Sequence, residues 1–128
     1  MKKLCVVFCF VLILSLLCGC GRVWGARVSV TGDGELHSDG DIHRAMGTVR
    51  RFFRRHYDGC QLDMLIYEAS HNIDRGNSRH QMVITTTFTV DASNTSGPLE
   101  PGETYENYSW ELERGFLGRW KLVNWGYG

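Results

Sequence analysis

The chain has 128 residues, with 14 basic and 14 acidic side chains, and 43% of its residues are hydrophobic. This length holds one folded domain, because each half of a divided chain would be too small to bury a core. The apolar content, together with the lack of low-complexity tracts and internal repeats, excludes disorder throughout. The balanced charge argues against a nucleic-acid binder, which needs a clear excess of basic side chains.

The N-terminus has the composition of a secretory signal peptide. Lys2 and Lys3 precede an apolar stretch from Leu4 to Leu17, and small residues follow. These are the charged, hydrophobic and cleavage regions of such a leader. The stretch is also shorter than the roughly 20 residues that span a bilayer comfortably. We therefore expect the leader to be removed, and loss of its two lysines from the 14 basic residues leaves 12 against 14 acidic residues in the mature chain.

The last residues of this leader indicate which kind it is. Leu17, Cys18, Gly19 and Cys20 resemble the lipobox of bacterial lipoproteins, in which a leucine and a small residue precede a cysteine that receives a diacylglyceryl thioether. The resemblance implies that residues 1–19 are a lipoprotein signal peptide, and that Cys20 is the lipidation site and carries palmitate-type acyl chains. Two acyl chains suffice for stable anchoring, at about 0.8 kcal/mol per buried methylene.

The expected location is therefore the cell membrane or the outer membrane, with the domain facing outside the cytoplasm. Two other interpretations stay open: an ordinary secretory signal cut after Gly25, and an uncleaved short anchor. A redox or zinc role for Cys18 and Cys20 is not expected, because zinc needs further ligands at matched spacing. After processing only Cys20 and Cys60 remain, so no intramolecular disulfide can form. We expect Cys60 to be a small core residue.

Residues 20–37 are interpreted as a flexible tether between the membrane and the domain. They are rich in glycine, with a short β-like patch at 27–31 and a turn signal at 32–34. A flexible chain of this length has an average reach of roughly 20–25 Å. We expect it to lift the domain off the lipid headgroups.

The folded domain, residues 38–128, begins with the clearest helix of the sequence. Ser38 or Asp39 is expected to cap its start, and Gly59 lies just past its last turn. One side of the helix carries residues at three- and four-residue spacing, which are Ile42, Ala45, Met46, Val49, Phe52, Phe53 and His56. The opposite side carries an arginine stripe, which is Arg44, Arg50, Arg51, Arg54 and Arg55.

The arginine stripe has two interpretations. In the first it contacts anionic lipid headgroups or an anionic wall polymer. In the second it is a solvated face whose arginines pair with nearby carboxylates. The slight acidic excess of the mature chain favours the second.

Four strands are expected after the helix. Alternating apolar residues predict strands at 60–68 and 81–91, separated by a polar loop at 70–79. A loop at 92–102 carries both prolines, and strands at 104–114 and 119–127 are expected to form a hairpin. With a four-residue turn, Trp110 would face Val123, and Trp120 and Leu122 would point to the opposite side of the ribbon. A turn one residue longer or shorter would change this register.

This order of elements resembles the nuclear transport factor 2-like, or cystatin-like, superfamily. In particular, the chain is similar to small bacterial lipoproteins of unknown function that share a helix ending in aromatic residues, a strand with a Leu…Tyr-Glu pattern and a closing W-K-x-x-x-W-G-Y. Here these are Phe52 and Phe53, residues 62–68 and residues 120–127. The resemblance implies an α+β fold, a cystatin-like roll with one long N-terminal amphipathic helix packed on a curved antiparallel sheet of about four strands. It also implies a cone-shaped cavity, although an evident second and third helix are lacking.

Catalysis in such a cavity needs a titratable group with a partner. The five histidines show no metal-binding spacing, and His56 alone lies on the apolar side of the helix. Tyr67 in the next strand, with Trp110 and Trp125 in the hairpin, are the other candidate cavity or binding residues. No catalytic motif is present, and neither a metal nor a cofactor is expected.

The sequence therefore favours a membrane-anchored, extracytoplasmic binding or interaction module without catalytic activity. Its expected partners are the membrane, through the anchor at Cys20, and an envelope protein or a small apolar ligand. Nucleic acid is not an expected partner. The alternatives are a cavity enzyme of the isomerase or hydrolase type, in which His56 is the best-placed base, and a structural envelope protein.

Overall fold

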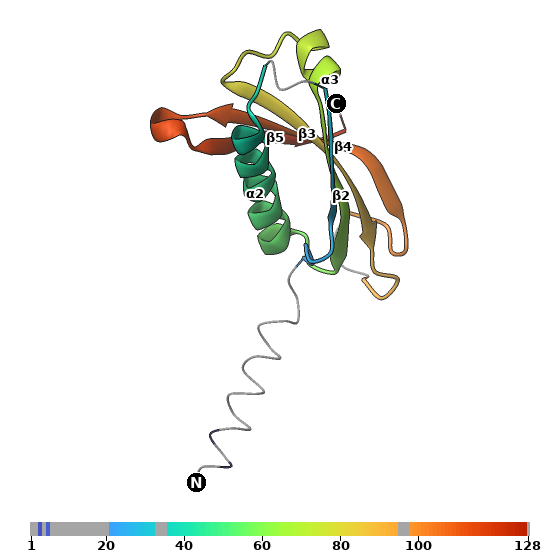
Figure 1. Ribbon diagram of the computed structural model, residues 1–128. Coiled ribbons are helices and arrows are strands. Elements are labelled where there is room, and N and C mark those ends of the chain that lie inside the picture. Colours follow the sequence, from blue (N-terminus) through green and yellow to red (C-terminus); the bar gives the residue numbers. More distant parts are fainter. Residues whose placement is uncertain (1–2, 4, 6–20, 33–35, 95–97, 128) are drawn as a thin grey trace.

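The structure, a computed structural model, describes residues 3, 5, 21–32, 36–94 and 98–127. The predicted signal peptide and Cys20 thus lie outside the described residues, apart from Lys3 and Cys5. The elements in chain order are β1 (Arg27–Thr31), α2 (Asp39–His56), β2 (Cys60–Glu68), α3 (Ala69–Asp74), β3 (Gln81–Val90), β4 (Thr104–Arg114), η1 (Phe116–Gly118) and β5 (Trp120–Gly126). Figure 1 shows the long helix α2 lying across one face of a curved sheet. In the described part of the chain, no helix has the length and apolar character needed to cross a membrane.

The sheet has five strands in the described chain, in the order β1-β2-β3-β4-β5. Strand β1 runs parallel to β2, and the other neighbours are antiparallel. The expected α+β fold, with one long helix on a mostly antiparallel sheet, is confirmed. Two details were wrong, because the sheet has a fifth strand and this strand precedes the helix, so that α2 is not N-terminal. Register shifts in each antiparallel pair are typical of β-bulges, which bend the strands and increase the twist of a sheet.

The segment expected to be a flexible tether is instead part of the domain. Its strand β1 pairs with β2 along its whole length. Before β1, the backbone N–H of Gly21 donates to the carbonyl of Arg54 at 3.0 Å, and Arg22 exchanges backbone hydrogen bonds with Cys60 and Leu62. Alternating β-branched residues suit a strand, and a parallel pair needs a crossover connection, which α2 supplies. As far as the structure describes this segment, it is therefore no tether.

Helix α2 starts and stops where the sequence predicts. Ser38 caps its start, since the Ser38 hydroxyl accepts a hydrogen bond from the Asp41 N–H at 3.2 Å. The buried face consists of Ile42, Ala45, Met46, Val49 and Phe53. His56 was predicted on this face and is instead exposed. The reason is that the helix ends at His56, and the next residue, Tyr57, turns into the core in its place.

The core lies between α2 and the inner face of the sheet. Strand β3 contributes alternate residues, as predicted, which are Met82, Ile84, Thr86, Phe88 and Val90. Trp110 is fully buried, and its indole N–H donates to the Thr86 hydroxyl at 2.7 Å. This bond satisfies both polar groups within the apolar layer. Cys60 is buried beside this layer, which confirms its predicted position in the core.

The loop expected at 70–79 is partly helical, because the short helix α3 covers Ala69–Asp74. Its Asn72 is fully buried, and the side-chain amide of Asn72 binds the backbone N–H and C=O of Val83 at 2.8 and 3.2 Å. Val83 belongs to the face of β3 that points away from α2, and it is buried next to α3. A segment this short and polar has no periodic pattern that predicts a helix, because its helical structure depends on tertiary contacts.

The hairpin of β4 and β5 forms in a different register from the predicted one. Trp110 pairs with Trp125, not with Val123. Arg114 pairs with Trp120, so an odd number of residues separates the strands where four were expected. This difference of one residue exchanges the faces of β5 near the turn. Trp120 is consequently buried and Leu122 packs against the core, although both were predicted on the other side.

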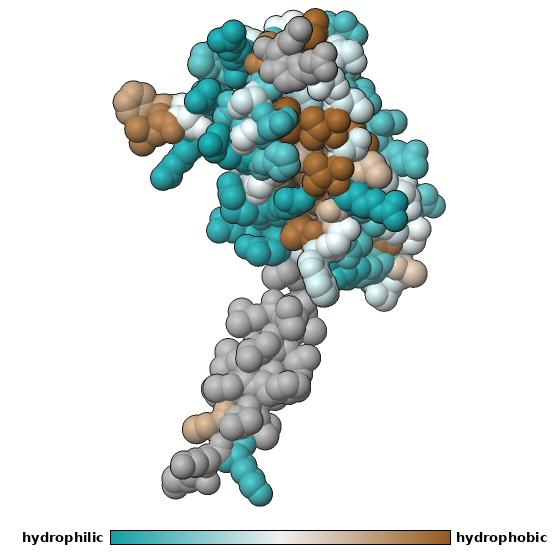
Figure 2. Space-filling view, viewed as in Figure 1, coloured by the Kyte–Doolittle hydropathy of each residue, from teal (hydrophilic) through white to brown (hydrophobic). Residues whose placement is uncertain are grey.

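Several apolar side chains remain exposed in the described part of the domain, and two groups of them lie on the edge strand β1 and at the tip of the hairpin. Figure 2 shows apolar side chains along the edge strand β1, where Val28 and Val30 are exposed. The hairpin projects away from the sheet (Figure 1), and its tip carries the exposed Phe116 and Leu117. Both places lie outside the core between α2 and the sheet.

Candidate functional site

A pocket of about 490 Å³ opens at the C-terminal end of α2. Its walls come from the last turn of α2, the turn before β2, the loop after β3, and strands β4 and β5. The lining residues are Phe52, His56, Tyr57, Asp58, Cys60, Asn94, Pro98, Leu99, Tyr108 and Trp125. Pockets with mostly aromatic and apolar walls and few polar groups are suited to binding apolar ligands. We refer to this site as the aromatic pocket.

The rings in the aromatic pocket pack against one another. The centroid of the Phe52 ring lies 4.6 Å from that of Trp125 and 4.3 Å from that of His56. The Tyr57 and Tyr108 hydroxyls form a hydrogen bond of 2.9 Å. Burial and this hydrogen bond raise the pKa of Tyr57 far above its usual value, so its phenol stays neutral. The Tyr57 side of the pocket wall therefore carries no charge, whereas Asp58 is an acidic residue of the lining.

The structure brings together two of the four predicted cavity residues. His56 and Trp125 both line the aromatic pocket, and Trp125 is 45% exposed. Trp110 is fully buried behind the wall, with its ring centroid 5.4 Å from that of Tyr57. It supports the pocket from the core side. Tyr67 does not belong to this site.

Tyr67 lies in the core and forms a hydrogen-bonded pair with His37. Its hydroxyl is 2.7 Å from Nδ1 of His37, and Nε2 of His37 is 2.8 Å from the carbonyl oxygen of Gln81. A carbonyl can only accept, so Nε2 carries a proton and donates. Burial raises the pKa of Tyr67. These bonds hold the segment before α2 against the sheet, a structural role for His37 that the sequence did not indicate.

The aromatic pocket assembles no catalytic pair from the described residues. The His56 ring packs on Phe52 and has no hydrogen-bond partner within the described chain, so nothing orients it as a general base. Burial raises the pKa of Cys60, and since the thiolate is the reactive form, this thiol is a weak nucleophile. In the part of the chain that the structure covers, no group of three or more His, Cys, Asp or Glu side chains could hold a metal ion.

The predicted arginine stripe lies at the surface of α2. Arg44 contacts the Asp41 carboxylate at 3.1 Å. The remaining members make no ion pair with any described residue, and these are Arg50, Arg51, Arg54 and Arg55. Pairing with nearby carboxylates, which was the favoured interpretation of the stripe, thus applies to one of its five arginines within the described structure.

The pocket residues that come from turns and loops were not predicted from the sequence. Tyr57 could have been found, because an aromatic residue between the last helical turn and Gly59 is well placed to cover the helix end. Pro98 and Leu99 carry no such signal, since they belong to a loop without a periodic pattern.

Comparison of the chain with protein-family models, with curated proteins and with solved structures found no match.

Proposed function

We propose that this protein is a lipid-anchored binding module that works outside the cytoplasm, and that its aromatic pocket captures a small apolar ligand. The anchor is Cys20, as the resemblance of residues 17–20 to a lipobox implies. The domain is a cystatin-like roll of the nuclear transport factor 2-like type. The proposal assigns no catalytic step to the pocket.

The wall chemistry of the aromatic pocket carries this proposal. Phe52, Tyr57 and Trp125 present rings to a space of about 490 Å³, a size that suits a small molecule. The Tyr57 and Tyr108 hydroxyls form a hydrogen bond with each other. An apolar ligand would therefore leave neither hydroxyl without a partner. His56 at the rim lacks an orienting partner among the described residues, which favours binding over catalysis.

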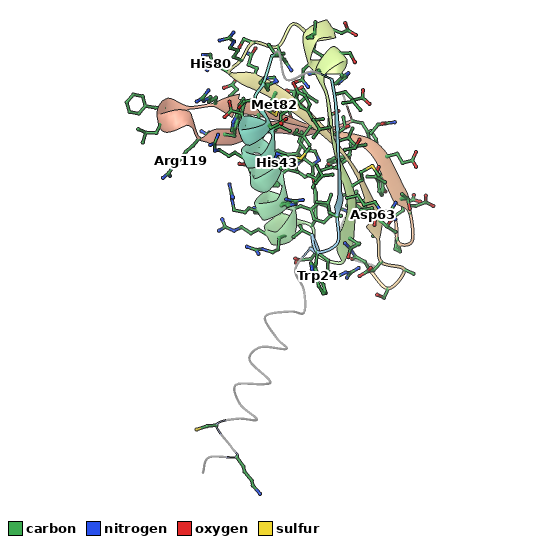
Figure 3. All side chains as sticks on the ribbon, in the orientation of Figure 1. Trp24, His43, Asp63, His80, Met82 and Arg119 are labelled. Atoms are coloured by element: carbon green, nitrogen blue, oxygen red, sulfur yellow. The ribbon has the colours of Figure 1, made fainter. Side chains whose placement is uncertain are left out.

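The path of the chain supports a site close to the membrane. Gly21, one residue after the proposed anchor, is hydrogen-bonded to the carbonyl of Arg54 in the last turn of α2. Successive Cα atoms are about 3.8 Å apart, so an acyl chain on Cys20 would hold this end of the domain next to the bilayer. Trp24 is 94% exposed and lies at the same end of the molecule (Figure 3). Tryptophan is favoured at membrane interfaces, and the aromatic pocket opens at this end of α2.

The experiment uses residues 21–128, which contain every strand and helix of the domain, and the neutral apolar fluorophore N-phenyl-1-naphthylamine. We expect a saturable rise in fluorescence. Trp125→Ala should weaken binding by about two- to tenfold, the scale of one aromatic contact. Val123→Ala is the matched control, because Val123 is exposed on the same strand and does not line the aromatic pocket.

Two outcomes would count against the proposal. The first is fluorescence that rises linearly with probe and never saturates. The second is an equal loss of affinity in the Trp125 and Val123 variants. The enzyme alternative makes a different prediction, namely that His56→Gln abolishes turnover of a bound ligand and leaves its affinity unchanged.

A further inference from the structure

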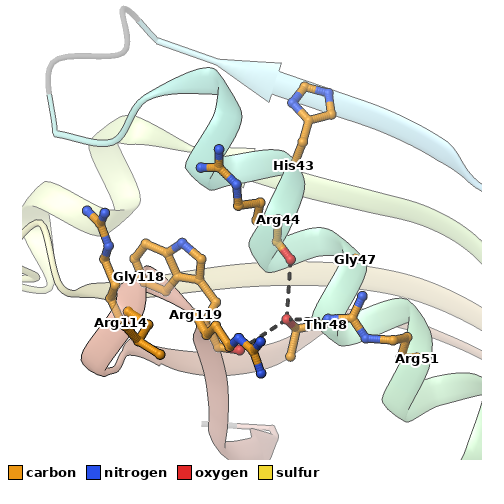
Figure 4. A pocket seen from close by; sticks show the side chains of 10 residues that line it. His43, Arg44, Gly47, Thr48, Arg51, Arg114, Gly118 and Arg119 are labelled. Atoms are coloured by element: carbon orange, nitrogen blue, oxygen red, sulfur yellow. Dashed lines mark hydrogen bonds between the residues drawn. The ribbon is translucent and has the colours of Figure 1, made fainter.

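A second and larger hollow separates the N-terminal part of α2 from the β4–β5 hairpin. It has a volume of about 940 Å³. Figure 4 shows side chains from both walls around it. Its lining residues are His43, Arg44, Gly47, Thr48, Arg51, Arg114, Leu117, Gly118, Arg119 and Trp120. We call it the arginine groove.

The arginine groove concentrates positive charge. Four of the described residues that line the groove are arginines, two from α2 and two from the hairpin. No described lining residue is acidic. Arg51 and Arg119 form no ion pair with any described residue. Like charges gathered in one concave site repel each other and raise the local concentration of anions. The groove therefore has the electrostatic character of an anion site.

A single carboxylate behind the groove holds two of these arginines in place. Asp41 lies 3.1 Å from Arg44 on its own helix and 3.5 Å from Arg114 on the hairpin, and its side chain is 14% exposed. Burial alone would raise the pKa of Asp41, but a hydrogen bond from the Trp120 indole and the nearby arginines lower it overall. Asp41 thus stays ionised and braces both walls. One carboxylate does not neutralise four guanidinium groups.

The distance between the two walls is fixed by contacts below the groove. The Thr48 hydroxyl lies 3.1 Å from the backbone carbonyl of Trp120 and 3.2 Å from that of Arg44, so its one hydrogen is shared between β5 and its own helix. Trp120 is buried and its ring packs edge-on against that of His37 at 5.8 Å. Since these residues are anchored in the domain, the groove exists before any ligand arrives, and binding costs less ordering of the walls.

We propose that the arginine groove binds an anion that carries two or more phosphate groups. Guanidinium groups present planar pairs of N–H donors that match phosphate oxygens. A phosphate has several terminal oxygens, so guanidinium groups from both walls can converge on it. The volume of the groove exceeds that of a single phosphate, and its arginines are spread over two walls, which suits an extended anion. The source is either a lipid headgroup or a soluble phosphate compound, and this proposal does not depend on the aromatic pocket or on Cys20.

The test uses the full chain in micelles of the neutral detergent dodecyl maltoside, titrated with inorganic tripolyphosphate in a calorimeter. The variant Arg51→Gln/Arg119→Gln removes from each wall one arginine that forms no ion pair with a described residue; Arg51 donates a hydrogen bond to the Thr48 hydroxyl at 3.2 Å. The matched control Arg54→Gln/Arg55→Gln removes the same charge from the same helix outside the groove. We expect the first variant to weaken binding by about tenfold or more, since hydrogen bonds to charged groups are among the strongest. The control should stay within about threefold of the parent chain, the scale of exposed charge effects.

Three results would overturn the proposal. One is the absence of saturable heat with tripolyphosphate. Another is an equal loss of affinity in the two variants, which would mean that diffuse charge attracts the anion. The third is equal or tighter binding of citrate, which would mean that the groove prefers carboxylates. Arg51, Arg54, Arg55 and Arg119 are all exposed, so both variants should melt at the temperature of the parent chain.

A further pair of titrations identifies the source of the phosphate. The micelles are doped with cardiolipin, whose headgroup carries two phosphates, in one sample and with phosphatidylcholine in the other. Weaker tripolyphosphate binding in the cardiolipin sample alone supports the proposal and assigns lipid headgroups as the ligand. Unchanged binding in both samples supports the proposal and assigns a soluble phosphate compound.

Discussion

Replacement of Asn72 by alanine should destabilise the whole domain. Strand β2 pairs with β3 as far as Ile66 and Thr85, and continuing this register would place Glu68 opposite Val83. The chain leaves the sheet there to form α3, and the Asn72 side-chain amide takes over both backbone groups of Val83, at 2.8 Å for the N–H and 3.2 Å for the C=O. The amide therefore acts as one more residue of the ladder.

The size of the loss follows from these bonds. The Asn72 amide also donates to the carbonyl of Glu68 at 3.0 Å and accepts from the Asn77 amide at 2.9 Å. Each bond contributes about 1 kcal/mol net, and an orphaned buried donor costs about 1–3 kcal/mol, so we expect a loss of about 3–5 kcal/mol. This is a large part of the roughly 5–15 kcal/mol that stabilises a typical domain.

Urea unfolding of residues 21–128, followed by circular dichroism, measures this loss. Asn77→Ala is the control, because it removes one of the same bonds and should cost about 1 kcal/mol. A loss below about 1 kcal/mol for Asn72→Ala would refute the reasoning, since it would mean that water or a shifted backbone satisfies Val83 equally well.

Three other predictions concern the anchor, the thiol and acid stability. Cys20→Ser should abolish incorporation of a radioactive fatty acid by cells, because the thioether requires sulfur, and equal labelling would contradict the lipobox assignment. In residues 21–128 Cys60 is the sole cysteine. Because Cys60 is buried and its pKa is raised, a thiol reagent should label the native protein at least about a hundredfold more slowly than the protein in urea. Fast labelling of the native protein would show that the thiol is accessible. The pKa of Asp41 is lower in the folded domain than in the unfolded chain. Ionised Asp41 therefore stabilises the domain above the unfolded pKa of about 3.9, and this stability is lost as pH falls through the lower folded pKa. Asp41→Asn should therefore reduce the difference in unfolding free energy between neutral and acid pH, and an unchanged difference would show that Asp41 does not contribute.

The elements with a strong periodic pattern could be predicted from the sequence, and those that depend on partners could not. Helix α2 has a capping residue, an apolar side and a stop signal, so its bounds followed from local rules. Strand β3 alternates along its whole length, so its buried side followed as well. The glycine-rich segment before α2 has a strand pattern too short to decide on its own. This segment forms the strand β1 because it pairs in parallel with the edge of β2.

The candidate sites show the same division. His56 and Trp125 were found as pocket residues because they belong to regular elements, although His56 lines the pocket from an exposed position and not from the buried face of α2. The arginines of α2 were found as a stripe, but Arg114 and Arg119 were not joined to them. That juxtaposition depends on the hairpin register, which a single residue in the turn changes. Tyr67 was placed correctly in a strand, and its partner His37 lies in a segment without a pattern.

The contact of Gly21 with α2 connects the proposed anchor to both sites. A side chain at this position would collide with the backbone carbonyls of Phe53 and Tyr57, so glycine is needed where the chain passes the helix end. With Cys20 acylated as proposed, the end of α2 that bears the aromatic pocket stays next to the membrane at any tilt of the domain. The helix residues of the arginine groove run from His43 to Arg51. They lie about 5–16 Å along the helix axis from Arg54, which Gly21 contacts, at 1.5 Å per residue. The groove can thus face headgroups or solution depending on tilt, whereas a ligand of the pocket can exchange directly with the bilayer.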